Sequence, residues 1–145
     1  MSNYNVQLKG ADKLIANLNR ISAELRGMVA LQAVDAGAQQ IKSKAVMNAP
    51  VKTGNLRNSA IVQTSATLTG AKAIIKFQME YARIQEFGGT VTAKNKPYLV
   101  FQVNGQWVKK KSVYINGKHY LQNAINSEQD LAVKAMGDAI AQYLR

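Results

Sequence analysis

The side chains that could act as nucleophiles lie close together in one short segment of the chain. Thr53 and Ser59 both belong to APVKTGNLRNSA, residues 49–60. A hydroxyl attacks a substrate only when a base beside it takes its proton, and the single histidine, His119, is distant in sequence. No spacing pairs His119 with either hydroxyl. We therefore expect residues 49–60 to form an architectural corner that binds no substrate.

Acid–base and metal chemistry have equally little support. The middle of the chain has two carboxylates, Glu80 and Glu86, and a change of structure is expected between them, so they form no facing pair. Cysteine is absent, and no HExxH, Walker-type or Gly-x-Gly-x-x-Gly motif occurs. We expect His119 to cap or pack near the start of the last helix. The sequence thus predicts a protein without catalysis, metal or cofactor.

The residue types of the corner suit a passage from a helix to a strand. Pro50 disfavours helical geometry in the residue before it and so ends the preceding helix. The Thr53 hydroxyl can accept a hydrogen bond from the amide of Asn55 or Leu56, which would cap a short helix that begins at Gly54. Leu56 would then anchor this helix in the core.

Positive charge is concentrated in the middle of the chain. There are 19 Lys and Arg against 8 Asp and Glu, a net charge of +11. The charges of residues 1–35 and 128–145 cancel, so residues 36–127 carry the whole excess. Such a block favours an anionic partner, either nucleic acid or the acidic face of another protein. A solvated basic surface would have the same composition.

One segment combines aromatic and cationic side chains. WVKKKSVY places Lys109, Lys110 and Lys111 between Trp107 and Tyr114. Such residues can stack on bases and neutralise phosphates, which makes a basic nucleic-acid-binding module the alternative hypothesis. Consecutive residues of a strand point to opposite faces, however, so three adjacent lysines do not form one basic stripe. The favoured interpretation is a hairpin arm whose lysines prevent pairing with stray strands.

Apolar periodicity predicts helices at both ends of the chain. A break at Arg26-Gly27 would separate a helix over about 11–24 from a longer one over about 27–48. A last helix is expected over about 118–144. The first stripe of apolar residues consists of Leu14, Leu18, Ile21, Leu25 and Met28.

The middle of the chain has the alternation that is typical of strands. Residues 61–68 and 71–79 flank the turn Thr69-Gly70, which predicts a hairpin. The segment YARIQEFGG that follows predicts a two-turn helix with Gly88 at its C-terminal cap.

A second hairpin is predicted around Asn104-Gly105, with strands over 97–103 and 106–115. It would form an extended arm over 96–115. The preceding segment GGTVTAKNK, residues 88–96, predicts a loop that becomes ordered at an interface, because glycine and lysine give it mobility when free.

These elements predict one α+β domain over residues 1–145. A long N-terminal helix and a C-terminal helix would pack on an antiparallel sheet, and the second hairpin would extend from it. No window approaches the ~20 apolar residues that span a bilayer.

Two segments taken together resemble a known family. APVKTGNLRNSA is similar to the Ala-Pro-x-x-Thr-Gly-x-Leu-(Arg)-x-Ser motif of the HK97 gp10-like phage tail-completion and head–tail joining proteins. YARIQEFGGT is similar to that family's Tyr-Ala-x-x-x-Glu-Phe-Gly-(Gly)-Thr stretch, and YLQNAI weakly resembles the start of its last helix. The motif positions here are Pro50, Thr53, Gly54, Leu56, Ser59, Tyr81, Glu86, Phe87 and Gly88.

One departure from the family lies just before the last helix. Family members often have a Pro-x-Arg-Pro-like approach, whereas this chain has INGKH, residues 115–119. Because Gly117 stands where family members often have prolines, we expect the start of this helix to be more flexible.

The resemblance implies a structural virion protein of a tailed phage or prophage, made in the host cytoplasm and located in the neck or tail. It implies a homo-oligomeric ring, six-fold or a multiple, between the head connector and the tail-terminator or tail-tube proteins, with no membrane and no catalysis. The ring interface or a non-specific contact with packaged DNA would use the basic arm. The candidate residues are Lys94, Lys96, Trp107, Lys109, Lys110 and Lys111.

Overall fold

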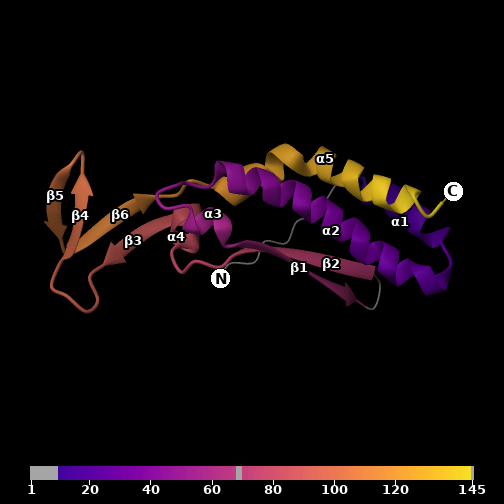
Figure 1. Ribbon diagram of the computed structural model, residues 1–145, viewed down its shortest axis with the longest axis horizontal. Helices are drawn as coiled ribbons and strands as arrows, with labels where there is room; N and C mark the ends of the chain where they lie inside the picture. The colour runs from indigo at the N-terminus through magenta and orange to yellow at the C-terminus, as the bar shows by residue number, and fades with distance from the viewer. Residues whose placement is uncertain (1–9, 68–69, 145) are drawn as a thin grey trace.

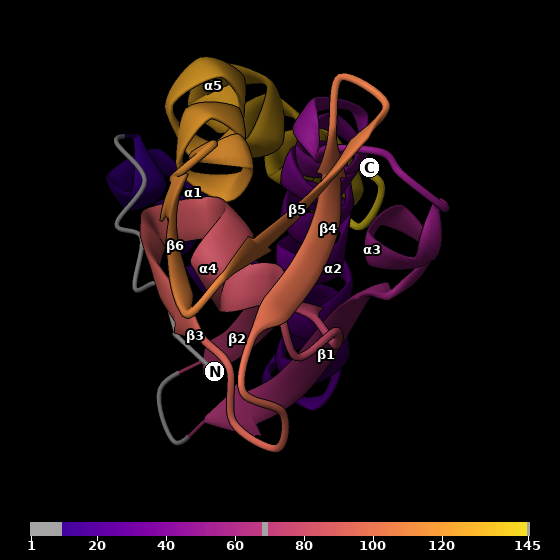
Figure 2. The same ribbon diagram turned by 90° about the vertical axis from the view of Figure 1, so that its left-hand side faces the viewer.

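The computed structural model describes residues 10–67 and 70–144 and has a layered body with a projecting arm (Figure 1). Helix α2 (Ala23–Asn48) runs through the middle of the body. Helix α5 (Tyr120–Ala141) lies along one side of α2, and the strands β1 (Ala60–Thr67) and β2 (Gly70–Phe77) lie along the other. Figure 2 shows the same layers from the end of the molecule.

Small residues on α2 allow the two long helices to approach closely. Val29, Ala33 and Gly37 are buried on α2. A Cβ at Gly37 would lie 2.7 Å from the Met136 Cγ and 3.3 Å from the Ala132 carbonyl oxygen, which are both on α5. The helices are therefore held together by side chains that interdigitate at short range.

The break between the first two helices lies earlier than the sequence suggested. Helix α1 (Ala11–Asn19) ends before Arg20, and α2 begins at Ala23, so the predicted break at Arg26-Gly27 is wrong. The Arg26 guanidinium donates to the carbonyl oxygens of Asn19 at 3.4 Å and Ile21 at 3.1 Å. Arg26 thus serves the end of α1 from inside α2, because carbonyls at a helix C-terminus have no partner within their own helix.

Gly27→Ala tests this boundary. Gly27 lies in the interior of α2, is exposed, and has no atom within 4 Å of an added Cβ. We expect the substitution to raise the free energy of unfolding by ~1 kcal/mol, since alanine loses less backbone entropy than glycine in a helix. Urea denaturation measures the change. A lower stability would instead support the break that the sequence suggested at this residue.

The hairpin of β1 and β2 is confirmed, and it packs on α2. The strands are antiparallel from the pair Ala60–Phe77 to the pair Thr67–Gly70. The turn predicted at Thr69-Gly70 lies partly outside the described residues. Phe77, at the end of β2, meets the ring of Tyr120 edge-on at a centroid distance of 4.9 Å, which joins the ribbon to the first turn of α5.

The core has two clusters, one at each end of the body. The larger joins α2, the β1–β2 hairpin and the first half of α5 through residues such as Ile41, Phe77 and Ile125. The smaller joins α1, α2 and the second half of α5. Its buried members are Leu14, Ile21, Val29, Ala33 and Ile140.

The arm contains two ribbons rather than one hairpin. Its outer ribbon, β4 (Leu99–Val103) with β5 (Gln106–Lys110), matches the predicted hairpin around Asn104-Gly105. The predicted strand over 106–115 is divided at Lys111, because β6 (Ser112–Asn116) pairs with β3 (Gly88–Thr92) instead.

The prediction of a loop over 88–96 was therefore wrong for its first half. Thr90, Val91 and Thr92 are β-branched residues that favour an extended backbone, and they pair with the chain as it returns from the outer ribbon. The arm thus spans residues 88–116. Figure 1 shows it extending beyond the helices at the end where α5 begins.

The α+β class is confirmed. Within the described residues the strands form three separate two-stranded antiparallel sheets. The helix predicted in YARIQEFGG is also confirmed as α4 (Ala82–Phe87), with Gly88 at its C-terminal cap.

Candidate assembly surface

The corner at residues 49–60 connects α2 to β1 through a single helical turn. Pro50 follows the last residues of α2, and α3 (Asn55–Asn58) begins one residue later than predicted, after Gly54. The Thr53 Oγ1 accepts a hydrogen bond from the Asn55 amide at 3.4 Å, as expected. Leu56 is buried in the larger core cluster, also as expected.

Two further polar residues of the corner, Arg57 and Ser59, bond to backbone groups. Arg57 donates from Nε to the Ala49 carbonyl at 3.1 Å and from Nη2 to the Met47 carbonyl at 2.9 Å, both at the end of α2. The Ser59 hydroxyl donates to the Leu56 carbonyl at 2.7 Å and accepts from the Gln78 amide at 3.2 Å. Ser59 therefore ties α3 to the end of β2.

The fold brings the two motif segments together. Tyr81 stands at the N-terminal cap of α4 and lines a shallow pocket with the corner residues from Pro50 to Leu56. The pocket has a volume of about 490 Å³ and is also lined by Gln85. Segments that are about 30 residues apart in the chain thus form one surface beside the base of the arm.

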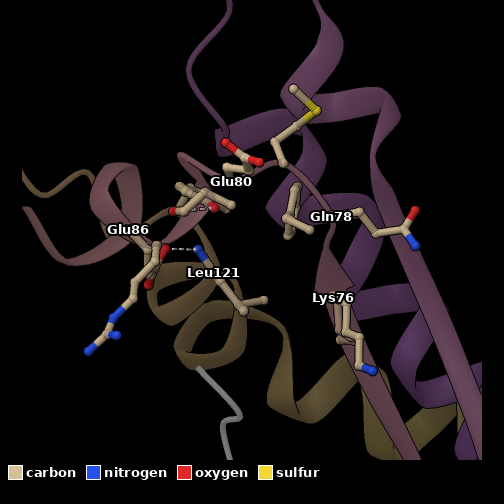
Figure 3. Close-up of a pocket in the computed structure, with 11 residues that line it drawn as sticks. Lys76, Gln78, Glu80, Glu86 and Leu121 are labelled. Atoms are coloured by element: carbon tan, nitrogen blue, oxygen red, sulfur yellow. Dashed lines mark hydrogen bonds between the residues drawn. The ribbon is translucent and has the colours of Figure 1, made fainter. Parts of the chain in front are cut away.

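Glu86 has a structural role that the sequence did not reveal. It is 3% exposed. Its Oε2 accepts from the Leu121 amide at 2.9 Å (Figure 3). Its Oε1 accepts from the Gln122 amide at 3.0 Å. Amides in the first turn of a helix have no intrahelical partner and favour a negative charge. Glu86 therefore caps α5 from α4.

The signal that could have revealed this role is a missing cap. The start of α5 has His119 at the cap position instead of Ser, Thr, Asp or Asn. His119 does lie near the start of the last helix, as expected, but its exposed side chain makes no capping hydrogen bond. A helix start without its own acceptor requires one from elsewhere in the fold.

The chain leaves and re-enters the body at a crossing of two glycines, Gly88 and Gly117. A Cβ at Gly88 would lie 2.6 Å from the Gly117 nitrogen, and a Cβ at Gly117 would lie 2.6 Å from the Phe87 carbonyl carbon. The Lys118 amide donates to the Gln85 carbonyl at 2.7 Å beside this crossing. Gly117 therefore permits close packing between α4 and the start of α5, a role that the sequence did not indicate; the expected flexibility of this start stays a prediction.

A second pocket lies beside this junction, between β2, α4 and α5. It has a volume of about 420 Å³, and Glu80 and Glu86 both line it. Figure 3 shows the side chains of Lys76 and Gln78 extending away from Glu86. Both oxygens of Glu86 accept hydrogen bonds from backbone amides, so its carboxylate holds the start of α5 in place. Among residues 10–67 and 70–144, no group of three or more His, Cys, Asp or Glu could hold a metal ion.

The arm exposes large apolar side chains. Trp107 is 71% exposed and Tyr114 is 67% exposed. The pairing of Gln102 with Trp107 and of Val100 with Lys109 places these four residues on one face of the outer ribbon, and all four are exposed. This face, Val100, Gln102, Trp107 and Lys109, is called the outer arm face below.

Comparison with known proteins then identifies the family. Residues 12–88 match the model of a family described as "Bacteriophage HK97-gp10, putative tail-component". The chain belongs to the HK97 gp10-like family. No curated protein and no solved structure gives a significant match to it.

The family match covers the part of this HK97 gp10-like protein that runs from α1 to the base of the arm. It includes the corner and α4 and ends at Gly88, where β3 begins. The arm and α5 lie beyond it. No helix in the described part of this phage tail-component family member is long and apolar enough to cross a membrane.

Proposed function

We propose that this protein joins the head connector of a tailed phage to its tail by forming a homo-oligomeric ring, six-fold or a multiple. The observation that carries the proposal is the match of residues 12–88 to a phage tail-component family. The chain would act as one domain over residues 1–145, made in the host cytoplasm and located in the virion neck or tail. It would act by docking, without catalysis.

The arm supports a role in assembly. Two-stranded ribbons are at best marginally stable in water by themselves, yet the arm consists of two such ribbons with exposed aromatic and aliphatic residues. Exposed tryptophan and tyrosine are typical of the residues that dominate binding energy in interfaces. The adjoining partners would be the head connector above and a tail-terminator or tail-tube protein below.

Mass measurement tests the proposal. We expect native mass spectrometry to give a monomer for the purified protein and a closed ring for the protein released from virion necks. Cross-linking of intact necks provides a control for dissociation during release. A protein that is monomeric in both preparations, or that is absent from the particles, would contradict the ring.

Packaged DNA is a second candidate partner, because the arm from residue 88 to 116 contains five lysines and no carboxylate. Phosphate neutralisation gives binding with a steep dependence on salt. Reversal of Lys109, Lys110 and Lys111 to Glu would then lower both duplex affinity and DNA retention in particles. The DNA contact is excluded if duplex binding is absent at low salt and particles of the reversed variant retain their DNA.

A further inference from the structure

The charges of the arm and of α5 are opposite. The arm has a formal charge of +5, from Lys94, Lys96 and the three lysines at 109–111. Helix α5 contains three carboxylates and one lysine, a formal charge of −2. The other two long segments of the body, α1 and α2, contain acidic and basic residues in similar numbers. Among the helices that the structure describes, α5 thus has the largest excess of carboxylates.

The exposed face of α5 also has an apolar residue at its centre. Ser127, Leu131, Lys134 and Asp138 recur at spacings of four, three and four, and all are exposed. Leu131 is 51% exposed. Asp130 is an exposed carboxylate beside it, whereas Asp138 pairs with Lys134 at 3.4 Å. This set, Ser127, Asp130, Leu131, Lys134 and Asp138, is called the α5 face below.

The outer arm face and the α5 face lie on different parts of the molecule. The arm leaves the body at the start of α5, and the rest of α5 runs away from it toward the opposite end (Figure 1). Contact between the two faces thus requires two copies. Contact between different surfaces of identical copies is head-to-tail, and such contacts close into a ring when the rotation between copies allows it.

From these observations we infer that the outer arm face of one copy docks on the α5 face of the next copy. The inference rests on the proposed homo-oligomer and names its interface. Trp107 and Val100 cover Leu131, and Lys109 lies against Asp130, with the remaining arm lysines adding positive charge nearby. Complementary charges fix the register of an interface and disfavour wrong pairings.

The composition of the arm favours a protein partner over DNA. Lys109 and Lys110 belong to opposite faces of β5, since side chains alternate along a strand, and the arm also exposes Val100, Val103 and Tyr98. A valine side chain makes no favourable polar contact with a phosphate backbone. An apolar centre with a polar rim is typical of protein–protein interfaces.

Disulfide trapping tests the contact directly, because the chain has no cysteine. Gln102→Cys lies on the outer arm face and Ser127→Cys on the α5 face, and both substitutions keep the charges and Trp107. We expect copies that carry one cysteine each, when mixed and oxidised, to give at least tenfold more dimer than a control pair of Gln102→Cys with Thr64→Cys. Thr64 is exposed on β1. Equal yields from the two pairs would overturn the inference.

Charge reversal supplies an independent test in particles. One variant has Glu at positions 109, 110 and 111, and the other has Asp130→Lys with Asp138→Lys. Each variant alone would bring like charges together and lower incorporation into necks at least tenfold. A mixture of the two variants should restore incorporation into necks. When the two variants alternate around an even-numbered ring, each arm meets an α5 face of opposite charge. Both variants should first give the circular dichroism spectrum of the parent protein.

The outcomes separate this interface from the proposed function. A ring in the necks together with failed trapping and no rescue in the mixture would overturn the arm–α5 contact and leave the ring intact. Loss of duplex binding in the lysine-reversed variant without any trapped dimer would assign the arm to DNA. Absence of a ring in the mass measurement would contradict the proposed function itself.

Discussion

Gly117→Ala is expected to lower the free energy of unfolding by ~3 kcal/mol. An added Cβ would lie 2.6 Å from the Phe87 carbonyl carbon, 2.7 Å from the Glu86 carbonyl oxygen and 2.8 Å from the Gly88 nitrogen. All three neighbours are backbone atoms, which cannot rotate away as the end of a flexible side chain can. Relief of the overlap would therefore move the start of α5 or the end of α4. Urea denaturation measures the loss.

Gly105→Ala is the matched control for this substitution. Gly105 has a φ of 80° but has no atom within 4 Å of an added Cβ. The free energy of unfolding of Gly105→Ala should fall by only ~1 kcal/mol, because alanine is disfavoured in the left-handed backbone conformation. Gly117 is not among the glycines with positive φ, so its larger loss would come from contact alone. Similar losses at the two positions would contradict a tight crossing at Gly117.

Glu86→Ala is expected to destabilise the protein by about 3 kcal/mol. It removes two hydrogen bonds to an acidic side chain and leaves the buried amide of Leu121 and the partly buried amide of Gln122 without these acceptors. Hydrogen bonds to charged groups contribute about 1.5–3 kcal/mol each, and part of this loss is recovered when water or the backbone adjusts. The amide exchange rates of these two residues, measured by NMR, should rise together with the loss in urea stability.

Two further variants isolate the cap. Glu80→Ala removes an exposed carboxylate from the same pocket and should change stability by no more than about 0.5 kcal/mol. Glu86→Gln keeps one side-chain oxygen as an acceptor and should retain about half of the stabilisation. If Glu86→Ala were as stable as Glu80→Ala, the capping role of Glu86 would be rejected.

Local signals in the sequence were sufficient for much of the fold. The stop at Pro50, the alternation of β1 and β2, and the Asn104-Gly105 turn each depend on neighbouring residues, so they could be predicted. Thr53 and Leu56 also behave as their local context predicts. These features follow from helical and strand periodicity and from turn chemistry.

The features that were missed depend on contacts between distant segments. Glu86 and Gly117 acquire their roles because α4 and the start of α5 meet. No residue close to either of them in the sequence indicates this contact. The pairing of β3 with β6 is likewise long-range, and it converted part of an expected loop into a strand. The break before α2 was predicted too late in the chain. Gly27 suggested a helix end by its type alone, whereas the contacts of Arg26 with the end of α1 depend on the folded structure.

Because of the glycine crossing at its base, the arm is an insertion whose two ends leave and re-enter the body at the same place. Both ends of residues 88–116 meet at Gly88 and Gly117, so the path through the body is nearly continuous without the intervening ribbons. Substitutions, extensions or exchange of the ribbons would leave the cap on α5 and the two core clusters untouched. Partner specificity could therefore diverge among related phages while the helical body stays the same.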